Sequence, residues 1–247
     1  MIHYHGGPIT PRSAAIQAWQ RRHACISFAN PQDVDLAAEV CQSFILDNGA
    51  YPLHTSGAGA VDVVGYAEFV DQWSRHPGFD WCLIPDKIDG TELDNDALLS
   101  EWLRQSVASV PVYHLHESLE RLRSLASGFQ RIAIGSSGEY WEVGSVKWWH
   151  RMHECMGVVC DEEGRPITKL HGLRMLNPTV FSQLPLSSAD STNVARNIGI
   201  DVRWSGPYVP KSKEARAMVL IDRIEAHASA ARYTGTMGTQ MNWELFG

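Results

Sequence analysis

The chain has 247 residues, of which 44% are hydrophobic, 9% aromatic and 20% charged, a composition that excludes disordered, collagen-like and coiled-coil proteins. Its length matches the roughly 250 residues of one eight-fold β/α barrel. Lysine and arginine number 21 against 28 aspartates and glutamates, so the net charge is −7. A nucleic-acid partner would therefore have to bind a local basic patch rather than the molecule as a whole.

The cysteines and the amino-terminal segment bear on the cellular compartment in which the protein is expected. The five cysteines are scattered and form no C-x-x-C pair, which favours neither a disulfide framework nor a zinc ribbon. The segment MIHYHGGPIT has no basic region followed by an apolar one, and no window approaches about 18 uninterrupted apolar residues. We therefore expect a cytoplasmic protein that does not associate with a membrane.

Eight short apolar runs are predicted to form strands, at residues 1–5, 24–29, 43–51, 80–86, 110–117, 131–137, 168–175 and 186–191. Segments with helical spacing or helix-start residues follow them, at residues 11–22, 31–40, 63–75, 92–105, 117–126, 145–162, 177–184 and 211–233. Strands that alternate with helices indicate a parallel sheet, and eight of each is the count of a closed barrel. We predict an α/β protein with a single (β/α)8 TIM barrel over residues 1–232 and a tail at 233–247.

In such a barrel, chemistry takes place at the carboxyl ends of the strands. Asp47, Asp86 and Asp190 lie at the ends of the third, fourth and eighth predicted strands. Each has a simpler explanation. Asp47 and Asp86 are both typical of turns, and Asp190 is typical of a helix N-cap.

Histidines also lie at the predicted strand ends. They are His3 and His5 on the first strand, His114 and His116 on the fifth, and His171 on the seventh. Side chains two residues apart on a strand point the same way, and imidazoles with a carboxylate such as Asp190 suit zinc. The pattern is typical either of a metal-dependent hydrolase or of histidines that are hydrogen-bonded within a core.

Small residues end the sixth predicted strand. Gly135, Ser136 and Ser137 could offer N–H groups to an anion or to the edge of a base, or could form a plain tight turn. The run is not a phosphate-binding P-loop, because no lysine follows at the required spacing. Arg174, near His171, is a candidate contact for phosphate or carboxylate, and a structural ion pair is the alternative.

Five segments follow one another along the predicted strands: ILDNGAY (45–51), LIPDKID (83–89), IAIGSSGE (132–139), KLHGLRML (169–176) and LSSADS (186–191). In this order they resemble the strand ends of the tRNA-guanine transglycosylases, and most of all the short phage-encoded relatives that place 7-deazaguanines in DNA. The resemblance extends from about the third to the eighth predicted strand.

The resemblance implies a role for each aspartate. Asp190 would be the nucleophile that attacks C1′ of a guanosine nucleotide and forms a covalent glycosyl-enzyme. Asp47 would protonate the departing guanine and later take a proton from the incoming base. Asp86 would accept hydrogen bonds from the purine. The other implied substrate-binding residues are Gly135, Ser136, Ser137, His114, His116, His171 and Arg174.

The chain also departs from the family pattern. It lacks the C-x-C-x2-C run that binds structural zinc in the tRNA enzymes and their basic tRNA-docking insertion, and Asn48-Gly49-Ala50 replaces Ser-Gly-Gly. We therefore expect DNA rather than tRNA as the nucleic acid, a free 7-deazaguanine as the second substrate, and no metal or cofactor. A phage-encoded chain would act in the host cytoplasm. A metal-dependent hydrolase and a non-catalytic nucleotide-binding relative remain as alternatives.

Overall fold

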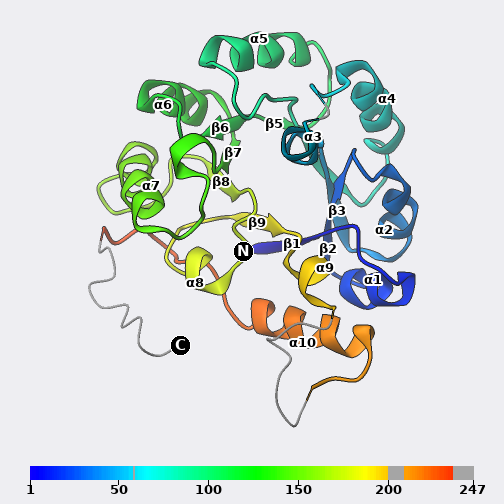
Figure 1. Ribbon diagram of the computed structural model, residues 1–247. Helices are drawn as coiled ribbons and strands as arrows, with labels where there is room; N and C mark the ends of the chain where they lie inside the picture. The colour runs from blue at the N-terminus through cyan, green and yellow to red at the C-terminus, as the bar shows by residue number, and fades with distance from the viewer. Residues whose placement is uncertain (58, 200–208, 236–247) are drawn as a thin grey trace.

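The strands of the computed structural model, which describes residues 1–57, 59–199 and 209–235, form one parallel sheet (Figure 1). They are β1 (Ile2–Gly6), β2 (His23–Ser27), β3 (Ser43–Asp47), β4 (Phe79–Leu83), β5 (Ser109–Val110), β6 (Val112–His114), β7 (Arg131–Gly135), β8 (Lys169–Gly172) and β9 (Ser188–Ser191). Their order in the sheet is β5-β4-β3-β2-β1-β9-β8-β7-β6.

The two ends of this order belong to one segment of chain. β5 and β6 are separated by Pro111 alone, which has no N–H group to continue a ladder. Val110 pairs with β4, whereas Val112 pairs with β7, and the Pro111 carbonyl accepts a hydrogen bond from Ala133. Residues 109–114 therefore connect both edges, and the sheet has the (β/α)8 TIM-barrel architecture that the sequence predicts.

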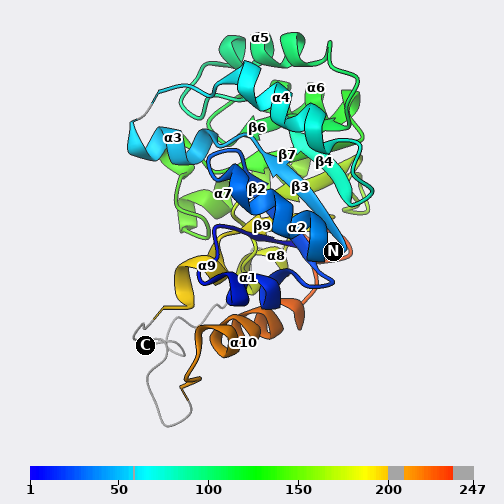
Figure 2. The ribbon, with the colours of Figure 1, turned by 90° about the vertical axis from the view of Figure 1, so that its right-hand side faces the viewer.

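Helices surround the sheet on its outer side (Figure 1). They are α1 (Arg12–Trp19), α2 (Val34–Val40), α3 (Ala50–Ser56), α4 (Val63–Trp73), α5 (Glu92–Trp102), α6 (Leu119–Gly128), α7 (Val146–Val159), α8 (Pro178–Phe181), α9 (Asn193–Asn197) and α10 (Lys213–Glu225), with 3-10 turns η1 (Pro31–Asp33) and η2 (Gly138–Tyr140). Side-chain caps start several of them; Thr91 and Asp94 form a capping box on α5. Figure 2 shows α10 beside α1, the pair that joins the two ends of the fold.

Side chains at alternate positions of each strand point into the barrel or toward the helices, and so form two apolar layers. The barrel interior contains Tyr4, Cys25, Ile45, Trp81 and Leu83 with their neighbours on β5, β6 and β7. The larger core lies between the sheet and the helices. Because successive strand residues face opposite sides, this alternation decides which polar side chains reach the centre of the barrel.

Several predicted boundaries are wrong, including the ends of the third and seventh predicted strands and of the last helix. The third strand ends at Asp47 instead of residue 51, because Gly49, with φ of +79°, turns the chain into α3. The seventh ends at Gly172, and the last helix ends at Glu225. Of the predicted tail, residues 236–247 lie outside the described part of the chain. Within residues 1–57, 59–199 and 209–235, no helix is long and apolar enough to cross a membrane.

Candidate active site

The carboxyl ends of the strands surround a pocket that seven of the ten predicted site residues line. Its walls are Asp47, Asn48, Ala50, Tyr51, Leu83, Asp86, Ile88, His114, Gly135, Ser136, Leu173, Arg174 and Asp190. These residues come from six different strand ends and the loops that follow them. The barrel geometry thus brings together positions that are far apart in the sequence.

Asp47 is the last residue of β3. Its Oδ1 accepts hydrogen bonds from Ser27 Oγ at 3.0 Å and from the Gly49 N–H at 2.8 Å. Burial, followed by the negative charge of Asp190, raises the pKa of Asp47 to about 7, although both hydrogen bonds act in the opposite direction. Asp47 is therefore suited to give and take a proton near neutral pH.

Asp190 lies on β9 beside Tyr4 of β1 and is only 6% exposed. Its Oδ1 accepts a hydrogen bond of 2.6 Å from the N–H of Arg174. Its Oδ2 lies 3.6 Å from the Nε2 of His171 and accepts a weak bond from the Cys25 thiol. Burial and the nearby charge of Asp190 raise the pKa of that thiol well above its usual value. These contacts fix the Asp190 carboxylate at the bottom of the pocket.

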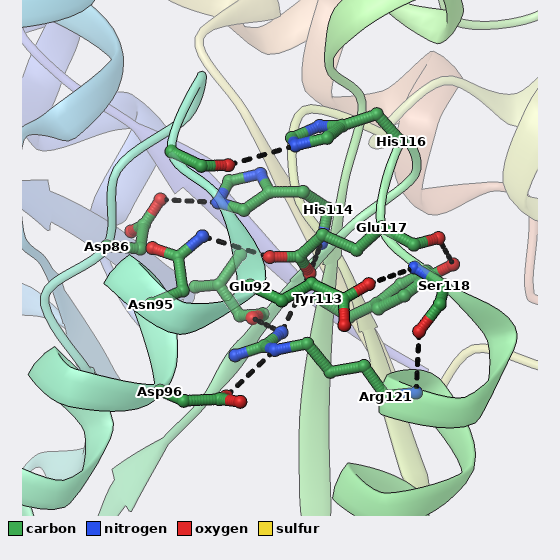
Figure 3. Close-up of polar contacts among 12 residues, drawn as sticks. Asp86, Glu92, Asn95, Asp96, Tyr113, His114, His116, Glu117, Ser118 and Arg121 are labelled. Atoms are coloured by element: carbon green, nitrogen blue, oxygen red, sulfur yellow. Dashed lines mark hydrogen bonds and ion pairs between the residues drawn. The ribbon is translucent and has the colours of Figure 1, made fainter.

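Asp86 follows β4 and forms the opposite wall. Asn48 Nδ2 donates to Asp86 Oδ1 at 2.7 Å and to the Ile84 carbonyl at 2.9 Å. His114 Nε2 lies 2.9 Å from Asp86 Oδ2 (Figure 3). Asn48, which the sequence marks only as a turn residue, is thus the group that joins the loop after β3 to the loop after β4.

A buried polar network supports this wall from below (Figure 3). Glu117 accepts hydrogen bonds from Asn95 Nδ2 at 2.9 Å, from the His114 N–H at 2.8 Å and from Arg121 Nη1 at 2.7 Å. Asn95 also binds the N–H and the carbonyl of Lys87, next to Asp86. The network therefore connects the chain beside Asp86 to the chain at His114, and neither Asn95 nor Arg121 is marked by a sequence motif.

Arg174 and Tyr51 form the rim of the pocket. The Arg174 guanidinium lies 3.8 Å from the centroid of the Tyr51 ring, a cation–π contact. Arg174 has φ of +59°, a left-handed conformation that is rare for a residue with a side chain. Both residues also line an adjoining cleft of about 410 Å³, which contains Arg196 and falls in the usual size range of small-molecule sites, about 300–1,000 Å³.

Three predicted substrate-binding residues lie outside the pocket, and two of them, His116 and Ser137, contact each other. His116 is exposed, with Nδ1 2.8 Å from Ser137 Oγ and Nε2 3.2 Å from the Gly90 carbonyl. Ser137 is buried against it. Neither residue lines the pocket, and their contacts hold the turn after β7 against the loop after β4. Ser136 does line the pocket, and its hydroxyl accepts a hydrogen bond from Trp148 Nε1 at 2.8 Å.

His171 is fully buried beneath Asp190 and does not line the pocket. Its Nδ1 lies 2.9 Å from Ser188 Oγ, and its ring meets Trp81 edge to face at a centroid distance of 4.8 Å. Its contact with the site is the 3.6 Å approach of Nε2 to Asp190. His171 is therefore placed to position Asp190 rather than to bind substrate.

The histidines of β1 point away from the pocket. Because Tyr4 points into the barrel, His3 and His5 point out, where His5 Nε2 lies 2.9 Å from Glu225 and His3 Nε2 lies 3.1 Å from the His227 carbonyl. The prediction that they converge on the barrel mouth is wrong. In the described part of the chain, no three His, Cys, Asp or Glu side chains are grouped as metal ligands.

Comparison with models of protein families and with curated proteins gives no match. Among solved structures, one described as a "Structural study of Project ID from Aquifex aeolicus VF5" is similar over 92% of this chain and 94% of that chain, with a TM-score of 0.49 and 8% sequence identity. Function must therefore be inferred from the residues of the site.

Proposed function

We propose that the protein is a glycosyltransferase that exchanges guanine in a nucleic acid, DNA in preference to tRNA, for a 7-deazaguanine. One observation carries the proposal: Asp47 and Asp190 share a pocket, and the pKa of Asp47 is about 7. Two carboxyl groups in different environments are the usual arrangement for transfer at a glycosidic carbon. The family resemblance of the strand ends supports the same reaction.

The exchange takes place in two displacements. A carboxylate oxygen of Asp190 attacks C1′ of the target nucleotide, the C1′–N9 bond breaks, and Asp47 gives its proton to the departing guanine. In the second displacement, N9 of the 7-deazaguanine attacks C1′ and loses its proton to Asp47. The bond to Asp190 then breaks, and both aspartates return to their starting states.

The shape of the site suits such a substrate. The pocket that contains Asp86 and Asp190, with a volume of about 70 Å³, would take the reacting part of the base, and the adjoining cleft of about 410 Å³, which contains Arg174 and Arg196, would take the sugar and phosphates. A base in duplex DNA has to leave the stack to enter the pocket, which costs a few kcal/mol. Polar contacts at Asp86 and His114 would offset this cost.

The covalent intermediate provides the test. Wild-type protein incubated with a guanine-containing DNA oligonucleotide should form an adduct that survives denaturation and adds the mass of the strand minus guanine. Asp190→Asn should form none and should keep its circular dichroism spectrum, whereas Asp222→Asn, an exposed change on α10, should react like the wild type. A fully active Asp190→Asn variant would rule out this mechanism. Base binding without adduct or exchange would point to a non-catalytic relative.

A further inference from the structure

One buried nitrogen in the pocket has no role in the proposed displacements. The His114 imidazole is 3% exposed, and it lines the pocket. Neither ring nitrogen has a hydrogen-bond partner among the described residues, although Nε2 lies 2.9 Å from Asp86 Oδ2. A buried polar atom normally has a partner in the protein or in a ligand, because leaving it unpaired is unfavourable.

The space beside this nitrogen is left open by a glycine. Gly135 on β7 lies opposite His114 of β6 in the sheet, and it lines the same pocket. A Cβ at Gly135 would lie 3.4 Å from His114 Nδ1. Leu173 and Val112 border the same position at 3.5 and 3.6 Å, so the missing side chain leaves a space of about one methyl group beside Nδ1.

The Asp86 contact determines what Nδ1 can bind. An ionised carboxylate accepts hydrogen bonds and donates none, so the 2.9 Å approach of Asp86 Oδ2 favours the tautomer with its proton on Nε2. In the neutral imidazole this leaves Nδ1 with a lone pair and no proton. Asp86 and His114 Nδ1 thus present acceptors to the pocket, which favour a ligand edge that carries N–H groups.

We propose that His114 Nδ1 accepts a hydrogen bond from an exocyclic amino group of the base, so that His114 determines specificity for a 2-aminopurine-type base. The inference rests on the proposed function, since it assigns the part of the base that the site distinguishes. Guanine and 7-deazaguanine carry the 2-amino group, whereas hypoxanthine-type bases lack it. Asp86 positions the imidazole, and His114 selects the base.

Isothermal titration calorimetry with two free bases tests this role without requiring catalysis. The probes are 7-deazaguanine and 7-deazahypoxanthine, which lacks only the 2-amino group. The wild-type protein should bind 7-deazaguanine about 10-fold more tightly, the effect of one hydrogen bond. His114→Gln can keep an amide facing Asp86 but places no acceptor at the Nδ1 position. It should therefore lose the preference, with unchanged affinity for 7-deazahypoxanthine.

A second variant leaves His114 in place. Gly135→Ala meets its neighbours at ordinary contact distances of 3.4 to 3.6 Å, so the fold should tolerate it. Its methyl group occupies the approach to Nδ1, so it should weaken the binding of 7-deazaguanine more than that of 7-deazahypoxanthine. His150→Gln, an exposed change on α7, is the matched control and should keep the 10-fold preference.

The outcomes separate the two proposals. If wild type and both pocket variants show the same preference for 7-deazaguanine, His114 does not read the amino group, and the proposed exchange reaction still stands. If the wild type binds neither base, the proposed function and the role of His114 both fail. Loss of preference in folded His114→Gln, together with retention in His150→Gln, supports the inference.

Discussion

Asp47 and Asp190 line one pocket but have different neighbours. Asp190 is held by the Arg174 N–H, whereas Asp47 accepts from Ser27 and Gly49 and is more affected by its burial. The negative charge of Asp190 adds to that effect and helps to raise the pKa of Asp47 to about 7. The proposed nucleophile thus contributes to the proton affinity of the proposed acid.

The raised pKa of Asp47 makes stability depend on pH. Between its ordinary value of 3.8 and about 7, the folded state binds a proton that the unfolded state has released. The free energy of unfolding therefore falls as pH rises through this window, and it does not change further above it. Asp47→Asn keeps an oxygen that can accept from Ser27 and Gly49 but cannot ionise. The free energy of unfolding of the variant minus that of the wild type should therefore increase from pH 4 to pH 8, by at most about 4 kcal/mol.

Urea unfolding of wild type and Asp47→Asn at pH 4, 6 and 8 measures this difference. The exposed Asp222→Asn change serves as the control and should show no such trend. A difference between wild type and Asp47→Asn that stays constant over this range would contradict the raised pKa.

At the scale of elements, the wall formed by Asp86 and His114 depends on the ends of α5 and α6. Glu117 is 2% exposed and pairs with Arg121, which is also buried. Removing the charge of Glu117 leaves the buried Arg121 with the half-exposed Asp96 as its remaining carboxylate partner. Glu117→Gln should therefore lower the free energy of unfolding by about 3 kcal/mol.

Urea unfolding of Glu117→Gln beside Glu120→Gln tests this. Glu120 is an exposed residue in the first turn of α6, three residues further along the chain, and its change should alter stability by less than about 0.5 kcal/mol. Equal effects of the two substitutions would show that the buried pair does not stabilise the ends of α5 and α6.

The element boundaries also show where sequence reasoning ends. The strand-end aspartates could be predicted because apolar runs end at them, but α3 could not. Its sequence, AYPLHTS, contains Pro52 and four hydroxyl or imidazole side chains, and it has one buried residue, Ala50. The helix therefore has no amphipathic pattern. Its pocket-lining residue, Tyr51, can be recognised only in the folded structure, where Arg174 packs against its ring.

The β1 histidines illustrate a second limit. Period two along the strand shows that His3 and His5 share a face, but not which face. Tyr4 points inward, and Glu225, 220 residues away, receives His5 on the outside. The packing of α10 near β1 determines which side of the strand His5 faces. Because this contact joins residues far apart in the chain, no pattern in the local sequence predicts it.

At the scale of the whole molecule, the candidate site lies at the carboxyl ends of the strands, and a polar cluster lies at their amino ends. β3 and β4 change register so that Phe44 and Ile45 pair with Phe79 and Trp81, and a bulge leaves Asp80 between them. Asp80 accepts a hydrogen bond from the Tyr4 hydroxyl at 2.7 Å and another from Ser43. Burial and Asp80 raise the pKa of Tyr4. This cluster closes the end of the barrel opposite the pocket.

Tyr4→Phe should therefore separate stability from activity. The change removes a buried hydrogen bond to a charged group, and we expect the free energy of unfolding to fall by about 2 kcal/mol. The rate of base exchange should be unchanged, because chemistry in a barrel lies at the other end. Thermal unfolding and the exchange assay on the same preparation give both quantities. Lost activity with unchanged stability would place Tyr4 in the site instead.

The most direct test of the account is incorporation of a base into nucleic acid. Purified protein is incubated with guanine-containing DNA and, separately, with tRNA, each with isotopically labelled 7-deazaguanine, and the digested nucleosides are analysed by mass spectrometry. The account predicts labelled 7-deazaguanosine from DNA with the wild type and none with Asp190→Asn. Incorporation into neither polymer, or equal incorporation with Asp190→Asn, would contradict it.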